Sequence, residues 1–177
     1  YRETELLRGR EMTTKSDAAS KSAPRTRGRN IIAVASGKGG VGKTWFSITL
    51  THAMVLEGHK ALLFDGDLGL ANIDIQLGLM PKHDLGGVIA GRISLKNAIT
   101  PFPDGGFDII AGRSGSGSLA NLPATRLQAL SDDLIQTGKS YDKVLIDLGA
   151  GVDQGVRQMT SLANTVIVIT NGDPTSL

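Results

Sequence analysis

Short apolar runs alternate with segments of helical periodicity along residues 31–177. Runs rich in Ile, Val, Leu and Phe have the length and composition of buried strands at residues 31–35, 61–64, 107–111, 143–146 and 165–169. Between them, apolar residues recur at helical spacing within 46–56, 85–99, 123–135 and 152–162. This alternation predicts an α/β fold in which a parallel sheet carries helices on both faces.

Glycine and proline limit several of these elements. Glycines interrupt residues 85–99, and Pro101 and Pro103 follow, so we expect one or two short helices there that the prolines stop. Pro123 is expected to begin the next helix. Residues 170–177 read as a strand end and the start of a turn, so we expect a fold that is truncated at its C-terminus.

Charge is divided unevenly along the chain. Residues 1–30 contain eight Lys or Arg against four Asp or Glu, whereas residues 31–177 contain eleven against thirteen. The basic segment, rich in Ser, Thr and Ala, predicts a disordered tail over residues 1–30, which could touch nucleic acid or anionic lipid by charge alone.

Other compositional features exclude several classes of site. Cysteine is absent, which excludes Cys-ligated zinc and iron–sulfur clusters. The sequence shows no uncharged apolar stretch of about 18 residues and no signal-peptide pattern, so we expect a cytoplasmic location.

A phosphate-binding pattern, G-x-x-x-x-G-K-[ST], lies between the first strand and the first helix, as Gly37-Lys38-Gly39-Gly40-Val41-Gly42-Lys43-Thr44. Glycines leave backbone N–H groups free to surround an anion, and the helix N-terminus adds its positive dipole end. Lys43 would reach the β- and γ-phosphates of a nucleoside triphosphate, and the Thr44 hydroxyl would bind Mg²⁺. Trp45 directly follows this motif, and we include it among the candidate nucleotide-binding residues. We expect its indole ring to pack in the core.

Three carboxylates follow the second and fourth strands. Asp147 ends the fourth strand, and Asp65 and Asp67 follow the second as Asp65-Gly66-Asp67. The carboxyl ends of parallel strands share one edge of a sheet, which places all three beside the phosphate-binding loop. Asp147 is a candidate for holding Mg²⁺ through its water molecules, and the pair Asp65 and Asp67 offers one residue for metal-bound water and one to orient the attacking water. Turn formation or helix capping is the alternative role.

Lys38 is a second lysine inside the same loop. An extra cation at this place could supply charge to the transition state of phosphoryl transfer, either on its own nucleotide or on one bound by a second subunit. The sequence leaves both arrangements open.

Three segments together resemble the MinD/ParA family of P-loop ATPases. Residues 38–44 match its deviant Walker motif K-G-G-x-G-K-[ST], residues 65–74 resemble its switch I, D-x-D-x-G-L-x-N-x-D, and residues 147–151 resemble its switch II, D-x-x-A-G. The resemblance covers roughly residues 31–177, which we identify as a P-loop ATPase domain. The segments 69–74 and 114–118 look closest to the flagellar-number regulators of the FlhG/FleN type.

The resemblance implies an ATP-dependent homodimer that hydrolyses ATP slowly, with Mg²⁺ and with stimulation by a regulatory protein partner. Lys38 would cross the dimer interface to the partner's phosphates, and Asp67 would position the attacking water. Asp65 and Asp147 would serve Mg²⁺.

Further roles follow from the same resemblance. Gly151 would sense the γ-phosphate and Asn171 would contact adenine. In MinD-like members a C-terminal amphipathic helix, absent from this sequence, binds the membrane surface.

We expect an ATP-gated switch that controls flagellar number and placement or the positioning of the cell pole or division site. A ParA-like DNA-partitioning ATPase is a second hypothesis, which the acidic balance of residues 31–177 disfavours. A third is a non-catalytic regulatory module that binds a transcription activator.

Overall fold

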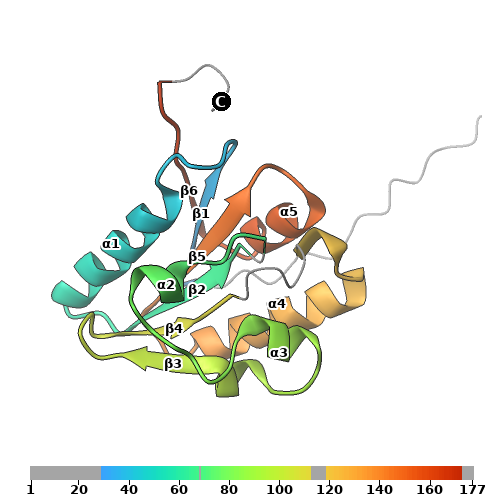
Figure 1. Ribbon diagram of the computed structural model, residues 1–177, viewed down its shortest axis with the longest axis horizontal. Coiled ribbons are helices and arrows are strands. Elements are labelled where there is room, and N and C mark those ends of the chain that lie inside the picture. Colours follow the sequence, from blue (N-terminus) through green and yellow to red (C-terminus); the bar gives the residue numbers. More distant parts are fainter. Residues whose placement is uncertain (1–28, 68, 113–118, 173–177) are drawn as a thin grey trace, which may run out of the picture.

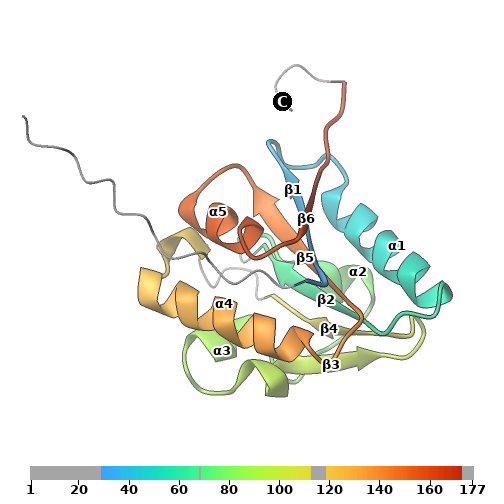
Figure 2. The same ribbon diagram turned by 180° about the vertical axis from the view of Figure 1, so that it is seen from behind.

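A six-stranded sheet with helices on both faces forms the centre of the computed structural model, which describes residues 29–67, 69–112 and 119–172 (Figures 1 and 2). The strands are β1 Ile31–Ser36, β2 Ala61–Gly66, β3 Ile99–Phe102, β4 Phe107–Ile110, β5 Lys143–Ala150 and β6 Thr165–Val168. The α-helices are α1 Lys43–Leu56, α2 Ile73–Gln76, α3 Leu85–Ile89, α4 Ala124–Gly138 and α5 Gln154–Thr160, with short 3₁₀ helices η1 Leu95–Ala98 and η2 Leu119–Asn121. The predicted α/β architecture is confirmed.

The sheet is parallel except at one edge. Its strand order is β3-β4-β2-β5-β1-β6, and only the pairing of β3 with β4 is antiparallel. All residues of the central strand β2 are buried, and its first four side chains alternate between two cores. Leu62 and Phe64 point into the core shared with α3, α4 and α5, whereas Ala61 and Leu63 point into the core shared with α1 and α2.

Strand β3 corrects the prediction for residues 85–103. Helices occupy only Leu85–Ile89 and Leu95–Ala98 of this region, and the chain enters a strand at Ile99. Pro101, which we had expected to stop a helix, lies inside that strand. Because β3 is an edge strand, a residue without a backbone N–H can be accommodated there without breaking the sheet.

Helix α1 packs on the sheet through a polar stripe. Its buried residues are Lys43, Ser47 and Thr51, spaced one turn apart. The Thr51 hydroxyl donates to the Ser47 carbonyl oxygen at 2.7 Å, and the Ser47 Oγ lies 3.0 Å from the Lys43 carbonyl oxygen. The apolar residues that predicted the helix flank this stripe or face solvent, as does Leu56. The periodicity therefore predicted the helix without identifying its most buried face.

The predicted tail falls almost entirely outside the described residues. Asn30, its last member, is described, and its side-chain amide donates to the carbonyl oxygens of Gly138 and Tyr141 at 2.8 and 2.7 Å. The segment 114–118 also lies outside the described residues.

Candidate nucleotide-binding site

The phosphate-binding loop joins β1 to α1 at the carboxyl edge of the sheet (Figure 1). The Ser36 hydroxyl, at the end of β1, donates to the Lys38 carbonyl at 2.9 Å and so fixes the start of the loop. Gly40 and Gly42 have φ angles of 75° and 90°, which side-chain-bearing residues rarely adopt. Gly42 is also the residue that precedes α1, so the glycines set the direction in which the helix begins.

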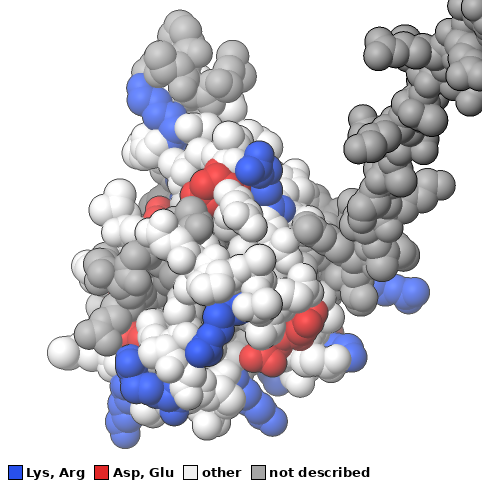
Figure 3. Space-filling view, turned by 90° about the vertical axis from the view of Figure 1, so that its right-hand side faces the viewer, with Lys and Arg blue, Asp and Glu red and all other residues white. Residues whose placement is uncertain are grey.

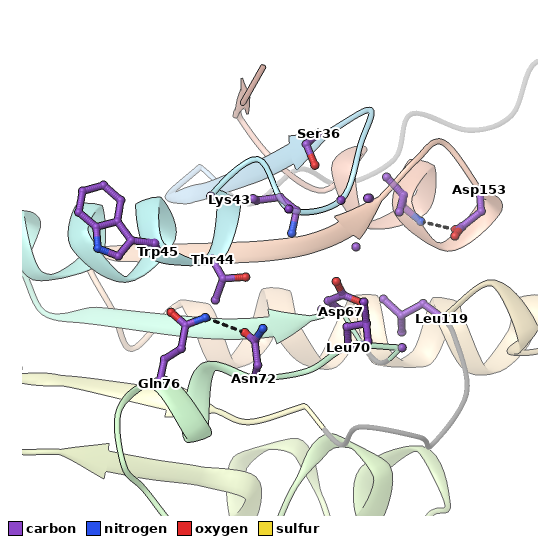
Figure 4. A pocket seen from close by; sticks show the side chains of 18 residues that line it. Ser36, Lys43, Thr44, Trp45, Asp67, Leu70, Asn72, Gln76, Leu119 and Asp153 are labelled. Atoms are coloured by element: carbon purple, nitrogen blue, oxygen red, sulfur yellow. Dashed lines mark hydrogen bonds between the residues drawn. The ribbon is translucent and has the colours of Figure 1, made fainter. Parts of the chain in front are cut away.

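A pocket of about 490 Å³ opens beside this loop. Its wall includes three loop glycines together with Lys43, Thr44 and Trp45, several residues between β2 and the end of α2, and the end of β5 (Figure 4). Segments far apart in the sequence therefore meet at one cavity, at the carboxyl ends of the strands. The volume suits a small-molecule ligand.

Asp147 lies in β5 next to the first turn of α1. Its carboxylate is fully buried, and one oxygen, Oδ1, lies 3.5 Å from the Lys43 ammonium and 3.0 Å from the Ser47 hydroxyl. Burial raises the pKa of the Asp147 carboxyl, while the Lys43 charge and hydrogen bonds from Thr44 and Ser47 oppose that rise. The site therefore brings a buried acid together with the two loop residues that the sequence assigned to phosphate and metal.

The second oxygen of Asp147 supplies a test of whether the site fits Mg²⁺. Oδ2 is buried and has no hydrogen-bond partner in the described part of the chain. No cluster of three or more His, Asp or Glu side chains that could hold a metal by itself occurs among the described residues. Mg²⁺ keeps several waters and binds through one or two protein oxygens plus phosphates, so Thr44 and the open Asp147 oxygen fit it.

Asp65 lies directly beside Asp147, because the two are register partners in the paired strands β2 and β5. Its Oδ1 accepts from the backbone N–H of Asp67, and its Oδ2 accepts from those of Asn72 and Ile73, each at 3.2 Å. Burial is the main cause that raises the pKa of Asp65 to about 7, and the nearby Asp147 charge adds to the rise. Both oxygens thus hold the loop that follows β2, which is the turn-forming role given above as the alternative for this residue.

Asp67 is half-buried in the wall of the pocket (Figure 4). Its carboxylate accepts from the backbone N–H of Leu70 at 3.1 Å. Gly149 of β5 lies against it, since a Cβ built on that glycine would come 3.4 Å from Asp67 Oδ1. The structure therefore places Asp67 in the same pocket as the phosphate-binding loop, and the sequence predicted that the two lie side by side.

Other predicted site residues are not part of the lining of this pocket. Lys38 and Val41 are in the loop but do not line the cavity, and the Lys38 side chain is exposed. Gly37 and Gly151 line a neighbouring groove, and the Gly151 N–H donates to the Ser36 carbonyl at 2.9 Å. Asn171 is exposed near the end of the described residues.

Trp45 corrects one expectation. It lines the pocket, as a nucleotide-binding residue would, but its side chain is 67% exposed rather than packed in the core. The reason is its place on α1, where Lys43 and Ser47 occupy the face toward the sheet.

Several lining residues carried no sequence signal. Leu119 and Asp153 come from η2 and from the start of α5 (Figure 4). Gln76, whose side-chain amide donates to Asn72 Oδ1 at 3.1 Å, comes from α2. Nothing in their local pattern shows that the fold gathers them, because each is brought there by long-range packing.

In the part of the chain that the structure describes, the longest apolar helices fall short of what a membrane crossing requires. Lys and Arg side chains on the face seen in Figure 3 lie in separate groups with Asp and Glu between them. The described residues on that face therefore form no continuous basic surface of the kind that nucleic acid binds.

Comparisons with known proteins agree with this geometry. The chain is 37% identical to the antiactivator FleN of Pseudomonas aeruginosa over 83% of its length, and 30% identical to the flagellum site-determining protein YlxH of Helicobacter pylori over 82%. It covers 52% and 49% of these two proteins, so it spans about half the length of the curated relatives it matches.

A solved structure shows the same fold. The septum site-determining protein MinD of Pyrococcus horikoshii, complexed with Mg-ADP, superimposes with a TM-score of 0.69 at 29% identity, covering 84% of this chain and 59% of that one. Residues 32–172 match the family described as the CobQ/CobB/MinD/ParA nucleotide binding domain. The chain therefore belongs to the MinD/ParA group of nucleotide-binding domains.

Proposed function

We propose that this chain is the ATPase domain of a nucleotide-gated switch, one that binds Mg·ATP, hydrolyses it and dimerises in the ATP state. The observation that carries the proposal is that Lys43, Thr44 and Asp67 line one pocket beside a glycine loop, and that buried Asp147 lies directly behind Lys43 and Thr44. A glycine loop at the start of a helix suits phosphates, as does a lysine beside it, and the unpartnered Asp147 oxygen suits hydrated Mg²⁺. ATP availability makes the cytoplasm the proposed location.

Different residues of the site would bind the phosphates, bind Mg²⁺ and orient the attacking water. The loop N–H groups and Lys43 would hold the phosphates, and Thr44 and Asp147 would hold Mg²⁺, which neutralises charge that develops on the phosphates. Asp67, on the pocket wall, would orient the attacking water. Asp65 would serve Mg²⁺ less directly, because both of its oxygens already accept backbone N–H groups.

The proposed cellular role is control of flagellar number and placement or of division-site position. It is supported by the similarity to FleN, to YlxH and to MinD. The partner would be a regulatory protein that binds the segment after Asp67 when this chain holds ATP.

Loss of the loop lysine tests the core of this proposal. Lys43→Ala should weaken binding of a non-hydrolysable Mg·ATP analogue by roughly ten- to a hundredfold, since a charge-assisted hydrogen bond is worth about 1.5–3 kcal/mol. Isothermal titration calorimetry measures the affinity. The exposed Lys82, outside this pocket, provides the control, and Lys82→Ala should bind like the parent. Equal affinity in Lys43→Ala and the parent would contradict the site assignment.

Light scattering tests the switch itself. We expect the chain to be monomeric with Mg·ADP and dimeric with the non-hydrolysable analogue, because Lys38 would contact the partner's phosphates. Lys38→Ala should bind the analogue and stay monomeric. A parent chain that keeps one mass with both nucleotides would show that these 177 residues do not form the dimer by themselves.

A further inference from the structure

The buried hydroxyl of Ser47 is part of the site although no motif includes it. Ser47 is one turn beyond Lys43 on α1, and its exposed fraction is 0%. Its Oγ lies 3.0 Å from Asp147 Oδ1 and 3.0 Å from the Lys43 carbonyl oxygen. A serine hydroxyl has one proton, so it can donate to only one of these two acceptors at a time.

The ionised carboxylate is the stronger of the two acceptors. Hydrogen bonds to a charged oxygen are roughly twice as strong as those between neutral groups. The Lys43 carbonyl, moreover, belongs to a helix, where the backbone N–H four residues later can satisfy it. When Asp147 is ionised, the Ser47 proton therefore goes to Oδ1 and leaves the helix carbonyl to the backbone.

The two oxygens of Asp147 consequently differ. Oδ1 is held by Ser47 and by Lys43 at 3.5 Å, whereas Oδ2 is buried with no partner in the described part of the chain. On the proposed function, Lys43 turns to the phosphates and the Thr44 hydroxyl to Mg²⁺ when nucleotide binds, so that of the three groups that hydrogen-bond to Asp147 only Ser47 remains to keep Oδ1 fixed.

We infer that Ser47 is a positioning residue, which holds Asp147 so that Oδ2 faces the water shell of nucleotide-bound Mg²⁺. This inference rests on the proposed function and adds a residue to it. Ser47 touches neither nucleotide nor metal, and its effect should appear only where Mg²⁺ contributes to binding.

Affinity for ADP with and without Mg²⁺, measured by calorimetry on the whole chain, isolates that effect. Ser47→Ala should lose roughly tenfold in Mg·ADP affinity, the lower end of what loss of a supporting hydrogen bond costs a metal site. Its affinity for ADP in excess chelator should equal that of the parent. Ser47→Cys, whose thiol is a weaker donor of similar size, should lose less, and it carries the test if the alanine variant fails to fold.

Ser131 provides a matched control. It is a serine with 0% exposure on α4, and its hydroxyl donates to the Leu127 carbonyl one turn earlier at 2.7 Å, as Ser47 can to Lys43. Ser131→Ala removes the same group from the same kind of environment without touching the pocket, so both affinities should match the parent.

The outcomes separate the two proposals. A Mg²⁺-specific loss in Ser47→Ala alone supports the inference. Equal Mg·ADP affinity in Ser47→Ala, Ser131→Ala and a parent that binds Mg·ADP overturns the role of Ser47 and leaves the proposed function in place. A loss of equal size with and without Mg²⁺ also overturns it, since Ser47 would then support the loop as a whole. A parent that binds no nucleotide overturns both.

Discussion

At the scale of single residues, the surroundings of Asp65 act on the pKa of its carboxyl in two opposite directions. Three backbone N–H groups donate to its carboxylate, an arrangement that favours the ionised form. Burial and the neighbouring Asp147 favour the neutral form more strongly and raise its pKa from 3.8 to about 7. The residue that holds the loop after β2 is therefore also one whose ionisation destabilises the fold.

The raised pKa of Asp65 predicts that the free energy of unfolding depends on pH. A carboxyl whose folded pKa is about 7 keeps its proton longer in the native state than in the unfolded state, so its contribution to stability is present below about pH 4 and lost as pH rises through 7. Relative to Asp65→Asn, the free energy of unfolding of the parent should fall by up to about 4 kcal/mol over this range. Urea unfolding of both proteins at several pH values measures it. Parallel pH profiles would contradict the assignment.

The residues that could be predicted from sequence are those with a local signature. Lys43 and Thr44 sit in a fixed motif, and Asp147 follows an apolar strand. Ser47 has no such signature, because a serine inside a helix gains its role only when β5 is packed against α1. Trp45 was misplaced for a related reason, since an aromatic residue next to a motif gives no sign of which helix face it occupies.

At the scale of elements, five strands were predicted with ends within a few residues, and β3 was missed. Prolines such as Pro101 and Pro103 usually indicate the end of a helical region, but an edge strand can accept them as well. The pairing direction of β3 was equally hidden, since it depends on the turn that joins it to β4. Buried strands can be predicted from sequence because they are continuous apolar runs, whereas edge strands lack this pattern.

The connection after β4 offers a prediction at this scale. Gly112 lies where a Cβ would come 2.5 Å from the Ala71 Cβ and 3.1 Å from the Asp65 carboxyl carbon. Gly112→Ala should therefore push the segment 67–73 away from β4 and destabilise the fold by about 1–3 kcal/mol. Urea unfolding measures the loss.

Gly172 is the matched control, because a Cβ there would meet nothing within 4 Å. Gly172→Ala should unfold with the parent. An unchanged midpoint in Gly112→Ala would show that the close approach can relax at no cost.

At the scale of the whole molecule, the sheet ends in an exposed apolar strand. Within the described residues β6 pairs only with β1, and Val166 and Val168 are 43% and 60% exposed. An apolar groove of about 670 Å³ runs between β6 and α5. Exposed edge strands of this kind favour pairing between molecules.

A charge on this edge should suppress such pairing. We expect the parent chain to self-associate as its concentration rises, and Val168→Lys to do so less, because lysine on an edge strand opposes strand addition. Static light scattering over a concentration series measures it. Nucleotide affinity should stay within about twofold of the parent, as for other surface substitutions. Thr49→Lys, an exposed position on α1, adds the same charge elsewhere and should leave self-association unchanged.

The polar stripe by which α1 packs on the sheet links ligand binding to the thermal stability of the domain. Lys43 lines the pocket and is also the first of three buried residues, with Ser47 and Thr51, by which α1 packs on the sheet, so binding of a molecule to Lys43 is coupled to unfolding of the whole domain. A ligand at a hundred times its dissociation constant adds about 2.7 kcal/mol to native stability. Melting temperature can thus rank nucleotides, metal ions and inhibitors for this chain without any knowledge of its cellular partner.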